Sequence, residues 1–360
     1  MTLPSIQELM APYVEKFPCT HTLQLALGSF GIDVRSNDER IIAELSGYFR
    51  DFHRASGHAD CEVLAIECAP QDLGIAYNVK EPEPGKAKIK EEWAELPHGR
   101  VVRKRLTDML FLFGEGRNLA LGPCLDNPNQ VVNFINNRFI EHKLNSGCLL
   151  GHAAGVSHKG MGLSLAGFSG MGKSTLSLHM MNHGLHFVSN DRVMVGRQSG
   201  HGGRLMMYGV AKMPRVNPGT VLNNPSLAKV MPESDREAFK DLPIEELWSL
   251  EHKYDAFIDE CFGPGRFDLE AEMKGLAILN WKRGGGDLKV TPVDIATRRD
   301  LLPAFMKSTG LFFDMNHDMP VPDFSEEAYL EVLKDCTVLE VTGGADFGRA
   351  AEELAKFLKA

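Results

Sequence analysis

The sequence predicts an α/β protein in which a phosphate-binding-loop (P-loop) domain follows an α+β N-terminal domain. Residues 167–174, Gly-Phe-Ser-Gly-Met-Gly-Lys-Ser, fit the pattern G-x-x-x-x-G-K-[ST]. The small apolar segment 162–166 before it suits a buried strand, and residues 175–181 after it are apolar at helical spacing. Because 360 residues exceed one typical domain, we expect two, at 1–145 and 146–360.

The composition narrows the class of protein. Hydrophobic residues at 43% and charged residues at 24% are ordinary for a globular chain. The net charge of −9 argues against nucleic acid or an anionic membrane as the main partner. Seven cysteines without a C-x-x-C pair indicate reduced thiols rather than a disulfide framework or a zinc site. With no signal-like start and no span-length apolar stretch, we expect a soluble, cytoplasmic protein.

Local patterns predict the elements of the N-terminal domain. Alternating residues on both sides of Gly28-Ser29 predict two strands and a tight turn. Asn37 and Asp38 are favoured N-cap residues, so a helix should begin there and run to about His53. The other predicted elements are a helix within 1–20, a strand at 61–67, a polar loop at 81–86, antiparallel strands at 100–115 and 118–122, and a helix at 128–143. None carries recognisable chemistry, so we expect a scaffold or partner-docking module.

The second domain is predicted around the glycine loop. A short strand at 186–189 delivers Asn190 and Asp191 at its carboxyl end, where ligand-binding groups lie in open α/β sheets. The remaining predicted elements are paired strands at 148–155 and 161–166, a loop helix ending at Gly184, a strand at 205–210, a polar excursion at 221–270 suited to act as a lid, a hairpin of 276–281 and 288–292, helices near 293–307 and 325–334, a strand at 338–341 and a last helix at 345–359.

The glycine loop is the predicted site of nucleotide binding. Glycines allow backbone N–H groups to turn toward phosphate oxygens at the positive end of the following helix. Lys173 is expected to reach the β- and γ-phosphates, and the Ser174 hydroxyl to hold Mg²⁺. The residues expected to bind ATP are Gly167, Ser169, Gly170, Met171, Gly172, Lys173, Ser174 and Thr175. The alternative is an ordinary glycine turn before a helix.

Charged residues beyond the loop extend the candidate site. Asp191 lies 18 positions past Lys173, after one helix and one strand, so its carboxylate can ligate Mg²⁺ or accept a proton from an attacking hydroxyl. Arg215 is the candidate for a further phosphate contact, with Lys212 as its weaker neighbour. The alternatives are a turn aspartate and solvated surface cations. The polar run at 251–255 is more typical of a solvated helix start.

Two segments carry a resemblance to a known family. Residues 167–175 and 187–193 resemble the core of the HPr kinase/phosphorylase superfamily, which pairs G-D-S-G-x-G-K-S with L-V-A-D-D-x-V at this distance. His152 occupies the place of that family's histidine, about fifteen positions before the loop. The resemblance covers roughly 148–220 and is closest to the HPr-kinase-related kinase B subgroup. It implies an α/β nucleotide-binding fold of the HPr kinase / phosphoenolpyruvate carboxykinase type.

The resemblance also implies roles for individual residues. Asp191 would be the general base, His152 would tune it, and Lys173 and Ser174 would take the phosphate- and magnesium-binding positions. From its guanidinium rather than from the resemblance, we also expect Arg215 to belong to the catalytic set. Ser174, Asn190 and Asp191 would surround Mg²⁺. Two departures stand out: Asn190 replaces an aspartate of the family, and Thr175 replaces a glutamate. Losing two carboxylates should weaken binding of a second Mg²⁺. No glycine-rich G-I-I-N-V-like segment occurs in 205–222, which puts HPr as substrate and the reverse phosphorolysis in doubt.

The expected function is an ATP- and Mg²⁺-dependent kinase that transfers the γ-phosphoryl group to a hydroxyl of a protein serine or a small molecule. Two alternatives stay open. One is an ATP-binding switch or scaffold with little turnover, and the other is an ATPase that acts on a partner. The resemblance further implies a homo-oligomer and an ATP-grasp partner protein.

Overall fold

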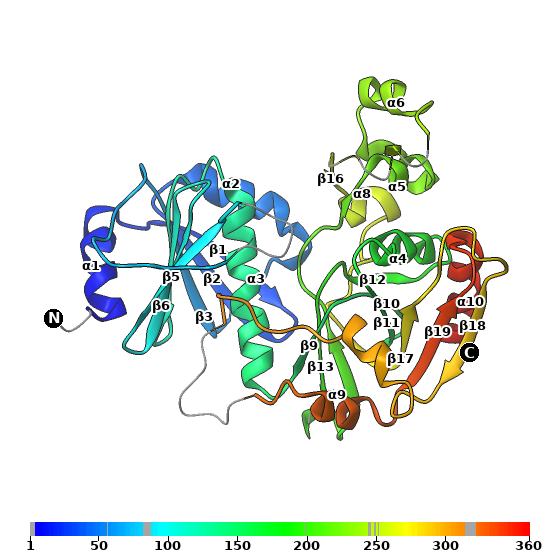
Figure 1. The fold of residues 1–360 in the computed structure, drawn as a ribbon. Helices are drawn as coiled ribbons and strands as arrows, with labels where there is room; N and C mark the ends of the chain where they lie inside the picture. Colours follow the sequence, from blue (N-terminus) through cyan, green and yellow to red (C-terminus); the bar gives the residue numbers. More distant parts are fainter. Residues whose placement is uncertain are drawn as a thin grey trace. The chain divides into compact units, whose positions relative to one another are not determined.

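The chain forms two compact units that mix helices and sheets (Figure 1). The computed structural model describes residues 4–55, 57–81, 88–197, 199–243, 246–247, 250, 252–313 and 322–360. Unit 1 is Met1–Asn145 with Thr309–Val321, and unit 2 is Ser146–Ser308 with Pro322–Ala360. The sequence assigns the whole of 146–360 to one domain, so the return of the chain to unit 1 at Thr309 differs from that prediction. Most of the predicted polar loop at 81–86 lies outside the described residues.

An eight-stranded sheet forms the centre of unit 1, in the order β1-β2-β3-β8-β7-β6-β5-β4. Its strands are β1 (His21–Leu27), β2 (Phe30–Ser36), β3 (Cys61–Glu67), β4 (Asn78–Val79), β5 (Glu91–Leu96), β6 (Gly99–Lys104), β7 (Met109–Gly114) and β8 (Arg117–Gly122). The helical elements are α1 (Ile6–Lys16), α2 (Glu39–Tyr48), the 3₁₀ turn η1 (Arg50–Phe52) and α3 (Pro128–Asn145). β3 pairs in parallel with β2 and β8, and the other neighbours are antiparallel.

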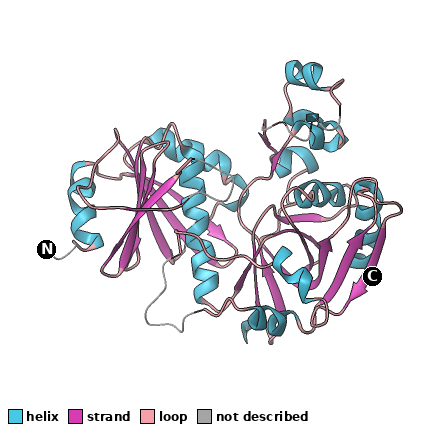
Figure 2. Cartoon of the chain, in the orientation of Figure 1, coloured by secondary structure: helices cyan, strands magenta, loops and turns pink. Residues whose placement is uncertain are grey.

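Helices cover both faces of the unit 1 sheet, which explains why every residue of β7 is buried (Figure 2). Successive side chains of a strand point to opposite faces. Leu110 and Leu112 pack in one apolar cluster with Ile6 of α1. Phe111, between them, contacts Phe134 of α3 with ring centroids 5.0 Å apart. A continuous apolar run is therefore the sequence signature of this two-sided strand.

Some local predictions for unit 1 are confirmed and others are wrong. The helix predicted to run to about His53 ends at Tyr48 and is followed by the 3₁₀ turn η1. Gly28, with φ +63°, makes the tight turn between β1 and β2. The Asp38 carboxylate caps α2 by accepting the Arg40 N–H at 2.9 Å. The predicted single strand over 100–115 is instead the hairpin of β6 and β7. Its chain reverses near Asp108, which has φ +52°, a conformation that aspartate tolerates better than most residues. The sequence patterns predict neither β4 nor β5.

A nine-stranded sheet forms the centre of unit 2, with β12-β10-β11-β17-β14-β13-β9 in order and β19 joining β17 to β18. Its strands are β9 (Leu149–Gly151), β10 (Ala153–His158), β11 (Met161–Gly167), β12 (His186–Ser189), β13 (Val193–Arg197), β14 (Leu205–Tyr208), β17 (Glu270–Leu279), β18 (Lys289–Val293) and β19 (Thr337–Thr342). The helical elements are α4 (Lys173–Met181), η2 (Ser199–His201), α5 (Pro218–Leu222), η3 (Pro225–Val230), α6 (Glu233–Phe239), α8 (Ile258–Phe262), η4 (Arg299–Ala304), α9 (Glu326–Leu333) and α10 (Phe347–Lys359). A separate pair joins β15 (Arg215–Val216) to β16 (Tyr254–Asp255).

Apolar side chains fill both faces of this sheet. Leu165 of β11 shares a buried cluster with Leu176 of α4 and Leu354 of α10. The next residue, Ala166, belongs to the cluster on the opposite face, together with Leu302 of η4. β11 thus ends in the phosphate-loop sequence at the edge of a core packed on both sides. None of the helices within the described ranges is both long and apolar enough to cross a membrane.

The predicted hairpin of 276–281 and 288–292 is wrong. β18 pairs with β19, and β19 lies beside β17 in parallel, so the two predicted partners are not neighbours. The glycines at 284–286 do not form the expected hairpin turn. Instead, the Gly344 N–H donates to the Gly286 carbonyl at 2.9 Å, which joins this glycine segment to the chain after β19. Helical turns occupy much of the predicted excursion at 221–270, and its role as a lid stays a prediction.

Candidate functional site

The glycine loop lies between β11 and α4, as the motif requires. Gly170 and Gly172 have φ of +82° and +85°, in the left-handed region that favours glycine. Gly172 forms the N-cap of α4, and its carbonyl accepts the Leu176 N–H at 2.8 Å. Phe168, Ser169 and Gly170 are exposed. The loop therefore presents backbone to solvent at the positive end of a helix, where anions bind favourably.

Two aromatic residues brace the loop from behind. The Trp281 indole N–H donates to the Met171 carbonyl at 3.0 Å. Phe347, at the start of α10, packs edge-on against Trp281 with centroids 5.1 Å apart. Gly172 has no room for a side chain, because a Cβ there would lie 2.5 Å from the Phe347 ring. These contacts brace the loop backbone at Met171 and Gly172.

Lys173 lies inside the loop. Its side chain is buried, and Nζ donates to the Gly167 carbonyl at 2.9 Å. Burial lowers the pKa of this ammonium, the Asp191 carboxylate opposes that change, and the positive charge of Lys307 adds to it. The ammonium has a neutral carbonyl as its hydrogen-bond partner, so it keeps a full charge to offer an anion.

Ser174 and Thr175 begin α4 and differ in their surroundings. Among the described residues, the Ser174 hydroxyl makes no hydrogen bond, although its carbonyl accepts from the Ser177 hydroxyl at 2.9 Å. The Thr175 hydroxyl lies 2.9 Å from that of Thr220 in α5. Thr175 therefore ties the loop helix to the 217–222 segment, whereas Ser174 stays available to a ligand.

The structure brings His152 and Asp191 together. His152 Nε2 lies 3.0 Å from Asp191 Oδ1, and Arg192 Nε lies 3.9 Å from Oδ2. The hydrogen bond from His152 holds the pKa of Asp191 well below its ordinary value; burial opposes this, and the charges of Lys307 and Arg192 reinforce it. The Asp191 side chain is 53% exposed, so an incoming group can reach it.

His152 is placed by a break in the predicted strand over 148–155. The chain forms β9, which pairs with β13, and then β10, which pairs with β11 and β12. His152 lies between the two, and its backbone N–H donates to the Phe305 carbonyl at 2.6 Å. His152 is therefore fixed between β9 and β10, and its side chain lies near the carboxyl end of β12, where Asp191 follows.

Lys307 is a candidate site residue that the sequence did not indicate. Its backbone N–H donates to the Leu150 carbonyl at 3.2 Å, and the Tyr329 hydroxyl donates to its carbonyl at 3.3 Å. Its charge acts on both Lys173 and Asp191. No motif surrounds Lys307. The pairing of Met306 with Gly151, flanked by the hydrogen bonds between Lys307 and Leu150 and between His152 and Phe305, brings it beside His152.

Lys212 and Arg215 lie on the segment that follows β14. Gly209 packs against β12 so closely that a Cβ would lie 1.9 Å from the Val188 carbonyl oxygen, and this contact carries the segment past Asp191. Burial lowers the pKa of the half-buried Lys212, with Arg192 adding to the effect and Asp191 opposing it. Arg215 is exposed and pairs with Asp255 at 3.5 Å. Lys212 is thus more closely coupled to the candidate site than Arg215.

Two further predicted groups have distinct surroundings. Asn190 Oδ1 is buried without a hydrogen-bond partner in the described part of the chain. No group of three or more His, Cys, Asp or Glu side chains suited to a metal occurs among the described residues.

In the polar run at 251–255, the Tyr254 hydroxyl donates to Asp235 at 2.6 Å, and Glu251 lies outside the described residues.

One open cavity of about 430 Å³ lies at the opposite end of α4 from the glycine loop. Its lining includes Met181, Asn182, Gly184 and Arg266. The Arg266 guanidinium donates to the Met181 carbonyl at 3.3 Å, so it serves to close the helix end. The loop glycines and Lys173 are absent from its lining, so this cavity is separate from the candidate phosphate site.

Comparisons with known proteins identify no family for this chain. No family model matches the chain, and no curated protein matches it. Among solved structures, the HPr(Ser) kinase/phosphatase from Coxiella burnetii is similar at 11% sequence identity, over 58% of this chain and 93% of that one, with a TM-score of 0.29. At this TM-score the likeness supports no functional conclusion, so function rests on the residues of this chain.

Proposed function

We propose that the protein is an ATP- and magnesium-dependent phosphotransferase that moves a γ-phosphoryl group to a hydroxyl acceptor. One observation carries the proposal. The buried ammonium of Lys173, inside a glycine loop at a helix N-terminus, interacts electrostatically with the carboxylate of Asp191. Lys212 and Lys307 also act on Asp191. A single carboxylate among several cations suits a polyphosphate whose negative charge shifts during transfer.

Asp191 is proposed to orient the acceptor hydroxyl. His152 holds Oδ1, and this leaves Oδ2 to accept the hydroxyl hydrogen. Because its pKa is lowered, the carboxylate is ionised across the physiological pH range but binds a proton weakly. This is compatible with phosphoryl transfer, whose loose transition state needs positioning more than early deprotonation. The proton passes to Asp191 as the acceptor oxygen bonds to phosphorus and ADP leaves.

The residues present fit a magnesium ion. Asn190 Oδ1 lacks a partner among the described residues, the Ser174 hydroxyl makes no hydrogen bond there, and Asp191 supplies a carboxylate. These are the oxygen donors that Mg²⁺ takes, usually one or two carboxylates with phosphate oxygens and water. When bound, the ion would neutralise charge on the phosphates.

Nucleotide binding is the first test. Calorimetry with ATP and Mg²⁺ should show binding by the native chain that Lys173→Ala abolishes. Lys274→Ala is the matched control, because Lys274 Nζ also donates to a backbone carbonyl, that of Phe357, at 2.9 Å in the same unit. Equal binding by the native chain and Lys173→Ala, or none by either, would end the proposal.

Asp191→Asn tests the chemistry. We expect the variant to bind ATP and to lose transfer to acceptors in a screen with labelled ATP. Asp268→Asn is its control, since Asp268 also pairs with a histidine, His186, at 3.1 Å. A fully active Asp191→Asn would remove the proposed role.

The neutral Asn190, which stands where the related family has an aspartate, motivates a second candidate, a nucleotide-binding switch or an ATPase with a partner. Phosphate release without an acceptor separates these: steady release favours the ATPase, and ATP binding without release favours the switch.

A further inference from the structure

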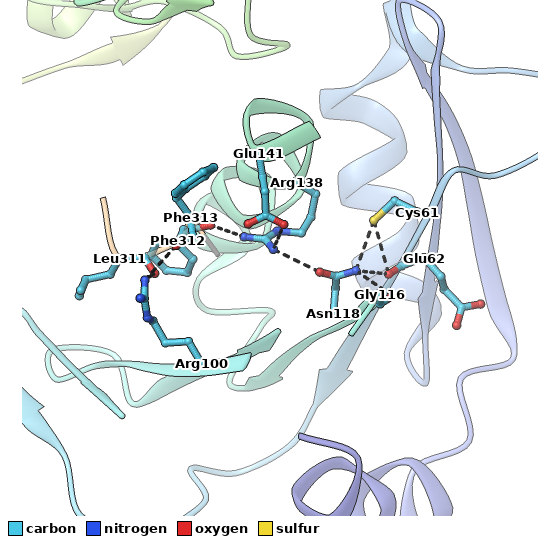
Figure 3. Close-up of polar contacts among 10 residues, drawn as sticks. All are labelled: Cys61, Glu62, Arg100, Gly116, Asn118, Arg138, Glu141, Leu311, Phe312 and Phe313. Atoms are coloured by element: carbon cyan, nitrogen blue, oxygen red, sulfur yellow. Dashed lines mark hydrogen bonds and ion pairs between the residues drawn. The ribbon is translucent and has the colours of Figure 1, made fainter. Parts of the chain in front are cut away.

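The chain leaves unit 2 after Ser308, and residues 309–313 belong to unit 1. There, two arginines bind their backbone carbonyls (Figure 3). Arg100 Nη1 donates to the Leu311 carbonyl at 2.7 Å and to the Phe313 carbonyl at 3.0 Å. Arg138 Nη2 donates to the Phe312 carbonyl. Three successive carbonyls are therefore held by guanidinium groups. Charge-assisted hydrogen bonds are stronger than neutral ones, so this short segment is firmly attached.

The Phe312 side chain strengthens the attachment. Its ring lies 5.3, 5.9 and 6.1 Å from the rings of Phe111, Phe113 and Phe134, and Lys104 Nζ lies 4.9 Å above it. Phe111, Phe113 and Phe134 are themselves buried. The ring thus fills an aromatic pocket formed by the unit 1 sheet and α3. We call residues 309–313 the strap.

The strap begins two positions after Lys307, a side chain of the candidate phosphate site, and Phe312 follows Lys307 by five positions. Lys307 precedes it, and the four steps of the chain from Lys307 to Leu311 can span at most about 14 Å. In unit 2, the backbone beside Lys307 pairs with β9 through the Gly151–Met306 bridge. β9 is also where the chain arrives after leaving unit 1 at Asn145. The chain therefore enters unit 2 just before β9 and leaves it just after Lys307. Both connections adjoin the paired segments 149–152 and 305–307, which we call the ribbon.

We propose that unit 1 positions the candidate phosphate site through the strap. Anchoring of Phe312 keeps the 305–308 segment paired with β9, and this pairing holds Lys307 and His152 toward Asp191. The inference rests on the proposed function only for its effect on nucleotide binding; its structural part stands without a nucleotide. Lys307 is then a phosphate-contacting residue, and Phe312 is a positioning residue that acts through it.

Amide hydrogen exchange tests the structural part without a nucleotide. Phe312→Ala should speed exchange of peptides covering 149–155 and 303–308 by about tenfold, because the Lys307 and His152 N–H groups lose protection. Phe139→Ala is the matched control. Phe139 is buried in α3 and packs on Phe30 at 6.0 Å, so its loss weakens unit 1 without touching the strap. Unchanged exchange in Phe312→Ala, or an equal increase in Phe139→Ala, would overturn the proposal.

A double-mutant cycle tests the route through Lys307. Lys307→Ala should weaken ATP binding about tenfold or more, the loss expected for one hydrogen bond to a charged group, and Lys307→Arg should restore most of it. Phe312→Ala should weaken ATP binding about three- to tenfold in the native chain but less than about twofold in the Lys307→Ala background. Phe312→Tyr, which keeps the ring, should bind normally.

The outcomes separate this inference from the proposed function. Additive losses in the cycle would mean that Phe312 does not act through Lys307. Normal binding by both single variants, with Lys173→Ala inactive, would overturn the strap's role and leave the phosphotransferase proposal intact. If the native chain binds no ATP, the phosphotransferase proposal fails, and hydrogen exchange alone decides whether the strap orders the ribbon.

Discussion

Gly172 allows a sharp test of how the glycine loop is built. Its φ is +85°, and a Cβ there would lie 2.5 Å from the Phe347 ring. Gly170 has nearly the same φ, +82°, but a Cβ there would meet nothing within 4 Å. Alanine at either position therefore suffers the same backbone strain, and only Gly172→Ala adds a collision.

The expected losses of folding stability follow from the backbone strain and the collision. Holding a non-glycine residue in the left-handed region costs roughly 1–2 kcal/mol, and we expect Gly170→Ala to lower the free energy of unfolding by this amount. Overpacking typically costs about 1–3 kcal/mol more. The Phe347 ring cannot move aside freely, because Trp281 at 5.1 Å and His179 at 5.9 Å flank it. Gly172→Ala should therefore lose roughly 2–5 kcal/mol.

Urea unfolding followed by circular dichroism measures both variants against the native chain. A third variant, Phe347→Ala, removes the ring that the new Cβ would strike. In that background, Gly172→Ala should cost no more than Gly170→Ala does. A loss for Gly172→Ala in the native background that equals the loss for Gly170→Ala would refute the packing of Phe347 on the loop.

Two other predictions concern single polar contacts. Burial opposes ionisation of Glu91, but hydrogen bonds from Lys104 and Lys80 outweigh it, so its pKa lies below the ordinary 4.5. The carboxylate therefore stabilises the fold at pH values above 4.5 and loses this effect as pH falls through its lowered pKa. Glu91→Gln should cost about 1–3 kcal/mol at pH 7 and progressively less as the pH falls below 4.5, measured by urea unfolding; a pH-independent difference would contradict it. Trp281→Phe removes the indole bond to the Met171 carbonyl and should lower thermal stability by about 1 kcal/mol and speed amide exchange in the glycine loop, whereas unaltered loop exchange would argue against the brace.

Elements set by local sequence were predictable. The Gly28 turn, the Asp38 cap of α2 and the loop-to-helix transition at Lys173 each depend on residues a few positions apart. Backbone preferences and capping act at that range, so a single sequence contains the signal.

Features that depend on distant pairing were not predictable. β19 inserts beside β17 because its apolar side chains complete the core there, and nothing in the glycines at 284–286 indicates this. Lys307 joins the candidate site because its segment, around Met306, pairs with the distant segment around Gly151. The family resemblance groups His152 with Asp191, whereas Lys307 belongs to no motif. Such contacts are decided by tertiary packing, which periodicity and local propensity do not encode.

The return of the chain to unit 1 has a consequence for folding during synthesis. A ribosome completes Met1–Asn145 long before it makes Phe312, so the first unit must wait, with its aromatic pocket uncovered, for about another 170 residues. Arg138 would meanwhile lack the Phe312 carbonyl. A fragment cut after Asn145 would share this defect permanently and should aggregate more readily than the full chain. Separate expression of the first unit therefore calls for a strap peptide supplied in trans or fused through a linker.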